Sequence, residues 1–152
     1  MGLIINGVIF QGEPTEATIK DMLDALNKIP QPEVIPIEKA NVQQDEVVLA
    51  FQREILLIDL SDQASEVLTK RRLAGTKQLV TCVMICIFNK DKFLLVHLDA
   101  TDIDLSVRLQ QFKDTKNLKV MLLGAGSAME NQRSSQLAIN NAKLSLRSLM
   151  KA

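Results

Sequence analysis

The fold is decided by the stretch LVTCVMICIFNKDKFLLVHL, residues 79–98. Residues 79–88 are apolar at nearly every position, which is typical of a strand that is covered on both faces. Asn89, Lys90 and Asp91 supply turn residues, and the apolar run 93–98 indicates a returning strand. The stretch therefore predicts a β-hairpin.

Patterns on the N-terminal side of this hairpin predict a second hairpin and a helix. Apolar runs flank Asn6-Gly7, a dipeptide that accepts positive φ at both turn positions, so a type I′ hairpin is predicted over 3–10. A helix is predicted over 14–28. Its apolar face is formed by Ile19, Met22, Leu23 and Leu26. Three prolines make residues 30–39 a stiff, extended connector.

The rest of the chain adds strands and two helical segments. We expect paired strands at 47–51 and 54–60, and a further strand at 118–123. Residues 61–72 fit either a short helix or a loop. A short helical stripe is formed by Leu105, Leu109 and Phe112. A closing helix is predicted over 135–150, with an apolar face of Ile139, Ala142, Leu146, Leu149 and Met150.

These elements favour an α+β domain over a doubly wound sheet, because most strands follow one another as hairpins. The expected architecture is a mostly antiparallel β-sheet or sandwich, flanked by two or three helices, in a single domain spanning 1–152. A formal net charge of zero argues against nucleic acid or an anionic membrane as partner. Two cysteines without a secretory signal lead us to expect a reduced, cytoplasmic compartment.

Cys82 and His97, the single histidine, lie at opposite ends of the central hairpin. With a two-residue turn, Cys82 lies directly opposite His97. A four-residue turn keeps both on one face as diagonal neighbours, and a three-residue turn places them on opposite faces. The sequence leaves the turn length open, because both strands are apolar on both faces.

A thiol beside an imidazole predicts nucleophilic chemistry. A nearby imidazolium lowers the thiol pKa, and the thiolate attacks. Asp99 lies on the same strand face as His97 and is a candidate for orienting the ring, while Thr81 and Thr76 are candidate hydroxyl groups. Backbone N–H groups for an oxyanion are predicted in the glycine-rich strand end formed by Gly124, Gly126 and Ser127.

Structural interpretations compete with several of these assignments. A lone cysteine in an apolar strand is most often a core residue, and Cys86 is interpreted in that way. Cys86 is too far along the strand for a disulfide with Cys82. Asp102 and Asp104 are also suited to capping the following helix. One histidine and few plausible partners fall short of a zinc site, so neither a metal nor another cofactor is predicted.

Around these residues the chain resembles protein N-terminal asparagine amidohydrolase. The resemblance rests on Thr81-Cys82, then strand, turn and strand, then His97-Leu-Asp99-Ala-Thr101-Asp102. Weaker similarities lie at 3–7, 49–55, 120–124 and 136–149. The layout is also similar to that of bacterial chemoreceptor glutamine deamidases. These use a Cys, a His and a Thr that precedes the Cys by six residues, as Thr76 precedes Cys82, and they share the glycine-rich strand end.

The resemblance implies hydrolysis of a side-chain carboxamide through a thioester, with Cys82 as nucleophile and His97 as acid and base. The expected substrate is a peptide or protein whose N-terminal Asn becomes Asp. Asp99, Asp102 and Glu54 are candidates for pairing with its α-ammonium group. Two alternatives remain open: deamidation of an internal Gln or Asn on a partner protein, and a non-catalytic interaction module in which Cys82 is only packed.

Overall fold

The computed structural model describes residues 2–30, 47–59, 73–76, 79, 81–101, 103–112, 118–124 and 132–152. The described part is an α+β arrangement, as the sequence predicted. In chain order its elements are β1 (Leu3–Ile5), β2 (Val8–Phe10), α1 (Glu16–Asn27), β3 (Val47–Ala50), β4 (Ile55–Asp59), β5 (Leu73–Thr76), β6 (Val83–Phe88), β7 (Lys92–Leu98), α3 (Ser106–Leu109), β8 (Lys119–Gly124) and α4 (Gln132–Lys151).

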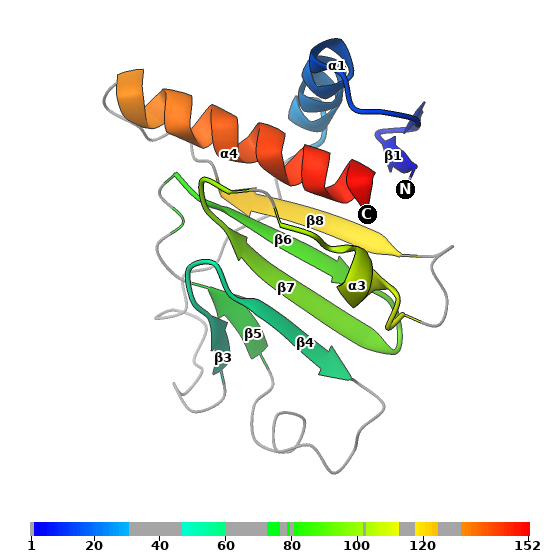
Figure 1. Cartoon of the computed structure of the whole chain (residues 1–152), viewed down its shortest axis with the longest axis vertical. Coiled ribbons are helices and arrows are strands. Elements are labelled where there is room, and N and C mark those ends of the chain that lie inside the picture. The colour runs from blue at the N-terminus through cyan, green and yellow to red at the C-terminus, as the bar shows by residue number, and fades with distance from the viewer. Residues whose placement is uncertain are drawn as a thin grey trace.

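The central hairpin forms the middle of a four-stranded antiparallel sheet with the order β4-β7-β6-β8 (Figure 1). Phe88 pairs with Phe93, so the turn between them has four residues, 89–92. The Asn89 side chain closes this turn by accepting hydrogen bonds from the backbone N–H groups of Asp91 and Lys92, at 2.8 and 2.9 Å. The predicted hairpin is confirmed, and its register is set by this turn.

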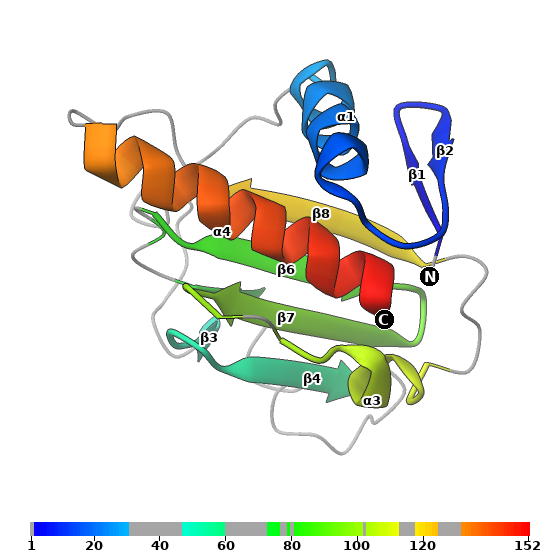
Figure 2. The same ribbon diagram turned by 45° about the horizontal axis from the view of Figure 1, so that its top comes forward.

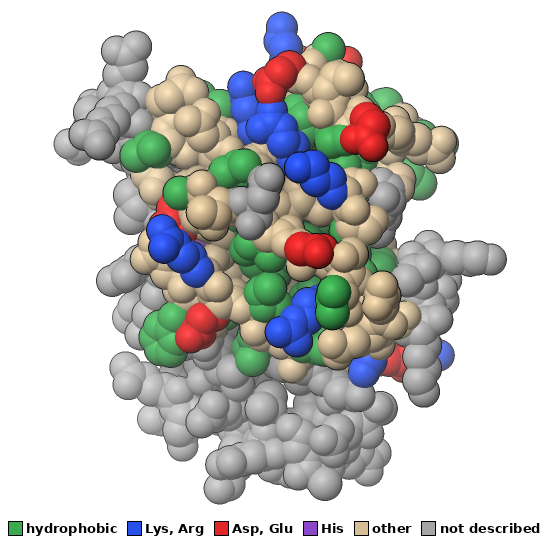
Figure 3. Space-filling model, in the orientation of Figure 1, with side chains coloured by type: hydrophobic (Ala, Val, Ile, Leu, Met, Phe, Trp, Pro, Cys, Tyr) green, Lys and Arg blue, Asp and Glu red, His purple; other side chains and the backbone are tan. Residues whose placement is uncertain are grey.

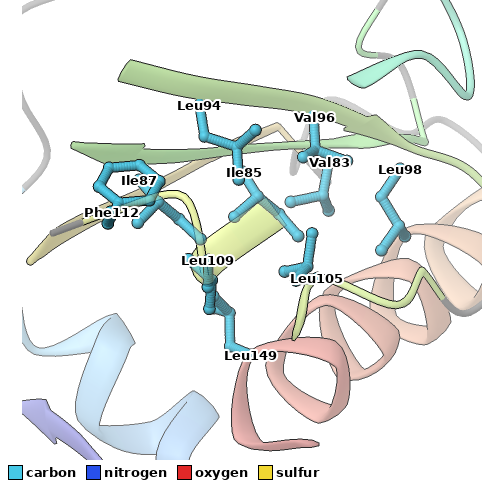
Figure 4. Close-up of a cluster of buried hydrophobic side chains, with 10 residues drawn as sticks. All are labelled: Val83, Ile85, Ile87, Leu94, Val96, Leu98, Leu105, Leu109, Phe112 and Leu149. Atoms are coloured by element: carbon cyan, nitrogen blue, oxygen red, sulfur yellow. The ribbon is translucent and has the colours of Figure 1, made fainter. Parts of the chain in front are cut away.

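One face of the sheet is covered by helices. Figure 2 shows α4 and α3 in front of the sheet and β3 behind it. Alternate residues of β6 and β7 point toward the helices, and Figure 4 shows them meeting side chains of α3 and α4. This core contains Val83, Ile85, Ile87, Leu94, Val96, Leu98, Leu105, Leu109, Phe112 and Leu149. The short helical stripe predicted at 105–112 is therefore part of the main core.

The opposite face packs against a different pair of strands. Ala50, Cys86 and Leu95 form a small buried cluster there. The prediction that 47–51 pairs with 54–60 is wrong: β3 pairs in parallel with β5, and β4 pairs with β7. A sharp turn at 51–54, in which Arg53 has φ +65°, carries the chain from one sheet to the other. The tetrapeptide of β5 carries too weak a strand pattern to be predicted.

The N-terminal elements confirm their predictions. Ile5 pairs with Val8 across Asn6-Gly7, and both turn residues have positive φ. Helix α1 is capped by Thr15, whose hydroxyl accepts a hydrogen bond from the Thr18 backbone N–H at 3.1 Å. The apolar face of α1 packs against β1 and the C-terminal half of α4. The predicted connector and residues 61–72 lie outside the described residues.

Helix α4 differs from prediction at one position. Ile139 was expected on the buried face, but it is 45% exposed. The buried face instead includes polar residues that interrupt the apolar pattern, among them Asn141 and Ser145. As for the bilayer, neither α4 nor any other described helix has the length and apolar character to cross it.

We expect Leu146→Ala to lower the free energy of unfolding by about 2–5 kcal/mol, because Leu146 is buried in the cluster between α1 and α4. The matched variant Ile139→Ala, on an exposed part of the same helix, should change it by only about 0.5 kcal/mol. Urea unfolding followed by circular dichroism measures both. Similar losses for the two variants would contradict this placement of α4.

Candidate active site

The register of the central hairpin places Cys82 and His97 on the same face. His97 pairs with Met84, and the last printed pair of the ladder is Val83 with Leu98. One further step along this register brings Cys82 opposite Asp99. Cys82 and His97 are thus diagonal neighbours, roughly 7 Å apart at Cβ, which side chains of this size can span. Among the alternatives left open by the sequence, the four-residue turn is the one observed.

The hydrogen bonds of His97 fix its tautomer. His97 is only 2% exposed, and its Nδ1 lies 2.7 Å from Thr76 Oγ1. Thr76 Oγ1 also donates to the backbone carbonyl of Ala50 at 2.7 Å. A hydroxyl has only one proton, and Thr76 gives it to the Ala50 carbonyl. The Thr76 oxygen must therefore accept a hydrogen bond from His97 Nδ1, so Nδ1 carries the ring proton. In the neutral ring the lone pair is then on Nε2, which has no hydrogen-bond partner among the described residues.

The protonation of His97 is governed by burial. Burial lowers the pKa of His97 from its ordinary value, and the negative charge of Asp99 opposes this shift. Burial has the larger effect, so the imidazole is neutral at pH 7. A neutral imidazole with a free Nε2 lone pair is the form that accepts a proton.

The turn at 51–54 holds the His97 backbone in place. The Arg53 N–H donates to the His97 carbonyl at 2.9 Å, and the His97 N–H donates to the Glu54 carbonyl at 3.2 Å. The Glu54 carboxylate accepts from the Phe51 N–H at 2.9 Å. Glu54, a sequence candidate for binding a substrate ammonium group, is thus engaged in closing this turn.

Cys82 is a protonated thiol rather than a thiolate. Its side chain is buried, and this burial raises its pKa. The charge of Asp99 and a hydrogen bond to its carboxylate raise the pKa further, while a hydrogen bond with Thr81 and the charge of Arg53 lower it. The expectation that an imidazolium lowers this pKa is therefore wrong, because the ring is neutral and the nearest charge is a carboxylate.

Asp99 is the residue at which the polar contacts of the site meet. Besides the Cys82 thiol, its carboxylate accepts from the Gln52 side-chain amide and forms an ion pair with Arg53 at 3.8 Å. Gln52 and Arg53 lie in the 49–55 segment of the weaker resemblance, but nothing in the sequence indicated a role in the site for either of them. The turn at 51–54 thus supports both His97 and Asp99.

Gly124 packs directly against the backbone of Cys82. It pairs with Val83 across β6 and β8 and has φ +105°. A Cβ on Gly124 would lie 2.4 Å from the Cys82 carbonyl oxygen, closer than atoms can approach. Gly124 therefore fixes the position of Cys82 by close contact. Asp102, Gly126 and Ser127 lie outside the described residues, so the predicted oxyanion donors and the second carboxylate stay predictions.

A pocket of about 370 Å³ opens at the end of the hairpin that carries Cys82 and Asp99. Thr81, Asp99 and Ala100 form its hairpin side. Its other side is formed by α4 residues Leu137, Asn140, Asn141, Lys143, Leu144 and Arg147. Figure 3 shows basic side chains gathered over α4, and Lys143 and Arg147 form ion pairs there with Glu16 of α1.

The remaining titratable groups do not suggest a metal centre. Cys86 is buried in the opposite-face cluster, and burial raises its pKa to about 11, consistent with its interpretation as a core residue. Asp104 accepts from the Ser106 N–H at 2.9 Å just before α3, whose N-cap residue is Leu105 rather than Asp104. Within the described ranges, no three His, Cys, Asp or Glu side chains gather in a way that could hold a metal ion.

Comparison of the chain with protein-family models, with curated proteins and with solved structures gives no match.

We expect Gly124→Ala to disturb Cys82 and to destabilise the protein by more than about 1 kcal/mol, since it combines positive φ with a backbone clash. Gly12→Ala is the matched control, because Gly12 also has positive φ (+86°) but nothing lies within 4 Å of an added Cβ. Thermal unfolding and the alkylation rate of Cys82 measure the two effects. Equal behaviour of the two variants would refute the close packing of Gly124 on Cys82.

The raised thiol pKa predicts slow alkylation of Cys82 at neutral pH, with a rate that keeps rising above pH 8.5, about the pKa of a free cysteine. Asp99→Asn removes the charge that raises the pKa, so alkylation at pH 8 should become faster. Asp91→Asn, in the turn at the other end of the hairpin, should leave the rate unchanged. Iodoacetamide labelling followed by peptide mass spectrometry separates Cys82 from Cys86. A rate that levels off below pH 7 would show a depressed pKa instead.

Proposed function

We propose that this protein is a thiol-dependent hydrolase of side-chain carboxamides. The observation that carries the proposal is the buried His97 ring, on the strand face that also carries Cys82: Thr76 holds its Nδ1, and its Nε2 has no hydrogen-bond partner among the described residues. A thiol and a proton acceptor are the two groups needed to form a thioester from an amide. The Thr76 hydrogen bond supports the proposal, because it gives the base its orienting third group.

The first step is attack of the Cys82 sulfur on the carboxamide carbon. The C–S bond forms while the thiol proton moves to His97 Nε2, which becomes an imidazolium. The ring then gives this proton to the amide nitrogen, the C–N bond breaks, and ammonia leaves. Asp99 stabilises the imidazolium during this step, since its negative charge favours the protonated ring.

The second step is hydrolysis of the thioester. His97 Nε2 accepts a proton from water, the resulting hydroxide attacks the carbonyl carbon, and the C–S bond breaks. The proton on His97 returns to the sulfur, which restores the neutral thiol and ring and leaves a carboxylic acid that releases its own proton to solvent to become the carboxylate product. Because His97 must be neutral to accept the first proton, the rate should fall only at pH values below about 6.5, the ordinary pKa of histidine.

The substrate we propose first is an N-terminal asparagine of a peptide or protein, as the resemblance in the Cys82 to Asp102 segment implies. Of the two described carboxylates considered for the α-ammonium group, Asp99 and Glu54, Asp99 has the more favourable position. It faces Cys82 and lines the pocket, whereas the Glu54 carboxylate closes a turn. An ammonium group paired with Asp99 would bring the side-chain amide of the same residue near the thiol.

A second candidate is deamidation of an internal glutamine or asparagine on a partner protein. The hydrogen bond between Thr76 and His97 favours it, because it joins two members of the Cys, His and Thr set of the chemoreceptor deamidases. That substrate has no free α-ammonium group. The two candidates therefore make opposite predictions for peptides with a blocked N-terminus.

We expect the purified protein to release ammonia from a peptide that begins with Asn, and much less from the same peptide after N-terminal acetylation. Cys82→Ala and His97→Ala should each reduce the rate by roughly 10³-fold or more, because each removes a reacting group. Thr76→Val, which leaves Nδ1 without its acceptor, should cause a smaller loss. Coupled-enzyme detection of ammonia measures these rates.

Cys86→Ala is the matched control, since Cys86 lies four residues further along the chain on the same sheet face and within a core cluster. It should keep the activity of the native protein. Equal release from the acetylated peptide supports the internal-amide candidate. Ammonia release that survives Cys82→Ala would sink both, and absence of release from all peptides would leave the interaction module.

A further inference from the structure

Asn141 of α4 connects the two strand ends that carry Cys82 and Asp99. Its Nδ2 donates to the Thr81 carbonyl at 2.8 Å, and its Oδ1 accepts from the Ala100 N–H at 2.8 Å. Thr81 precedes Cys82, and Ala100 follows Asp99. Asn141 is 3% exposed and lies on the face of α4 that packs against the sheet. Both ends of one buried amide are thus used to hold the hairpin end.

This amide takes the place of a step in the β-ladder. The hairpin register pairs Val83 with Leu98 and, continued by two residues, brings Thr81 opposite Ala100. In a continuing ladder, a carbonyl and an N–H of facing residues would bond to each other directly. Here the Asn141 side chain bonds to both, so it bridges the two strands one residue beyond Cys82 and Asp99.

The backbone beside Asp99 is shaped for this contact. Ala100 has φ +58°, a left-handed conformation that costs an alanine about 1–2 kcal/mol and that must be held by surrounding contacts. The contacts on each side of it are the Asn141 hydrogen bond and a hydrogen bond from the Thr101 N–H to the Asp99 carbonyl at 2.7 Å. The strain is therefore maintained where Asp99 leaves the strand.

We propose that Asn141 is a positioning residue, which sets the gap across which the Cys82 thiol meets the Asp99 carboxylate. Asn141 also forms part of the wall of the pocket that Thr81, Asp99 and Ala100 line. The inference deepens the proposed function, and it rests on that function only for its kinetic consequences. The alignment itself can be measured without any catalysis.

The test compares Asn141→Leu with Asn140→Leu. Asn141→Leu keeps the size of the side chain and removes both hydrogen bonds, whereas Asn140 is exposed and bonds through its side chain to Gln136 at 3.0 Å. The readout is the rate at which iodoacetamide alkylates Cys82 at pH 8, with Cys86 of the same molecule as an internal reference. The buried thiol of Cys86 reports general loosening of the fold, because it lies in a core cluster away from Asn141.

We expect Asn141→Leu to accelerate alkylation of Cys82 by about tenfold, the change that one unit of thiol pKa produces, as the contact with Asp99 is lost. The Cys86 rate should stay within about twofold, and Asn140→Leu should change neither rate. If the deamidase activity is found, Asn141→Leu should lower kcat with little change in KM. The serine side chain in Asn141→Ser is too short to reach both strands. This variant should therefore also raise the alkylation rate of Cys82, and it provides the same test with less disturbance of packing.

If Asn141→Leu raises the alkylation rates of Cys82 and Cys86 equally, as it would if the variant were unfolded, the proposal is overturned. That result would show that Asn141 acts only on stability. Unchanged alkylation of Cys82 in both folded variants would overturn it as well. The native protein could release no ammonia while Asn141→Leu still raises the alkylation rate of Cys82 alone. That result would remove the proposed function and leave the positioning role intact.

Discussion

The register of the β6–β7 pair is the constraint on which the site depends. Phe88 pairs with Phe93 because the turn has four residues, which the Asn89 side chain closes through two backbone N–H groups. A slip of one residue would move every side chain of one strand to the opposite face and separate Cys82 from His97. The turn thus positions two residues that lie at the far end of the hairpin, about six residues away along each strand.

Given that register, the electrostatics of the site follow from burial, which has the larger effect on both Cys82 and His97, and from a single carboxylate. Asp99 raises the pKa of the Cys82 thiol and partly offsets the lowering of the His97 pKa by burial. Both groups are consequently neutral at rest, unlike the thiolate and imidazolium pair that the sequence analysis expected. In the mechanism we propose, the proton therefore moves from sulfur to nitrogen only as the substrate reacts, and the charge of Asp99 is available for the imidazolium that forms.

The sequence was sufficient for much of the local structure and for the choice of Cys82 and His97 as candidate reacting groups. Apolar patterns located the central hairpin, α1 and the buried stripe of α3. The Asn6-Gly7 pair located the turn of the N-terminal hairpin. Strand pairing was less accessible, since the partner of β3 is a four-residue strand far along the chain, and nothing local in either strand specifies parallel pairing. Polar residues that serve the site from other elements, such as Gln52 and Asn141, carried a signal only as polar interruptions. Asn141 is a polar residue on the buried face of α4. Because it interrupts the apolar pattern of that face, the predicted face included Ile139, which is exposed.

The two ends of the hairpin differ in a way that argues for function at one of them. The end at Asn89 is closed by local hydrogen bonds. The other end combines a left-handed Ala100, a glycine in contact with the Cys82 carbonyl and a buried amide between the strands. Next to it, a buried His97 nitrogen lacks a partner among the described residues, and such an atom costs about 1–3 kcal/mol. An apolar side chain at position 97 would avoid that cost and would fit a strand that is otherwise almost entirely apolar. Stability alone therefore gives no reason for these features to occur together, whereas a site that must receive a proton at Nε2 requires that atom to be left without a fixed partner.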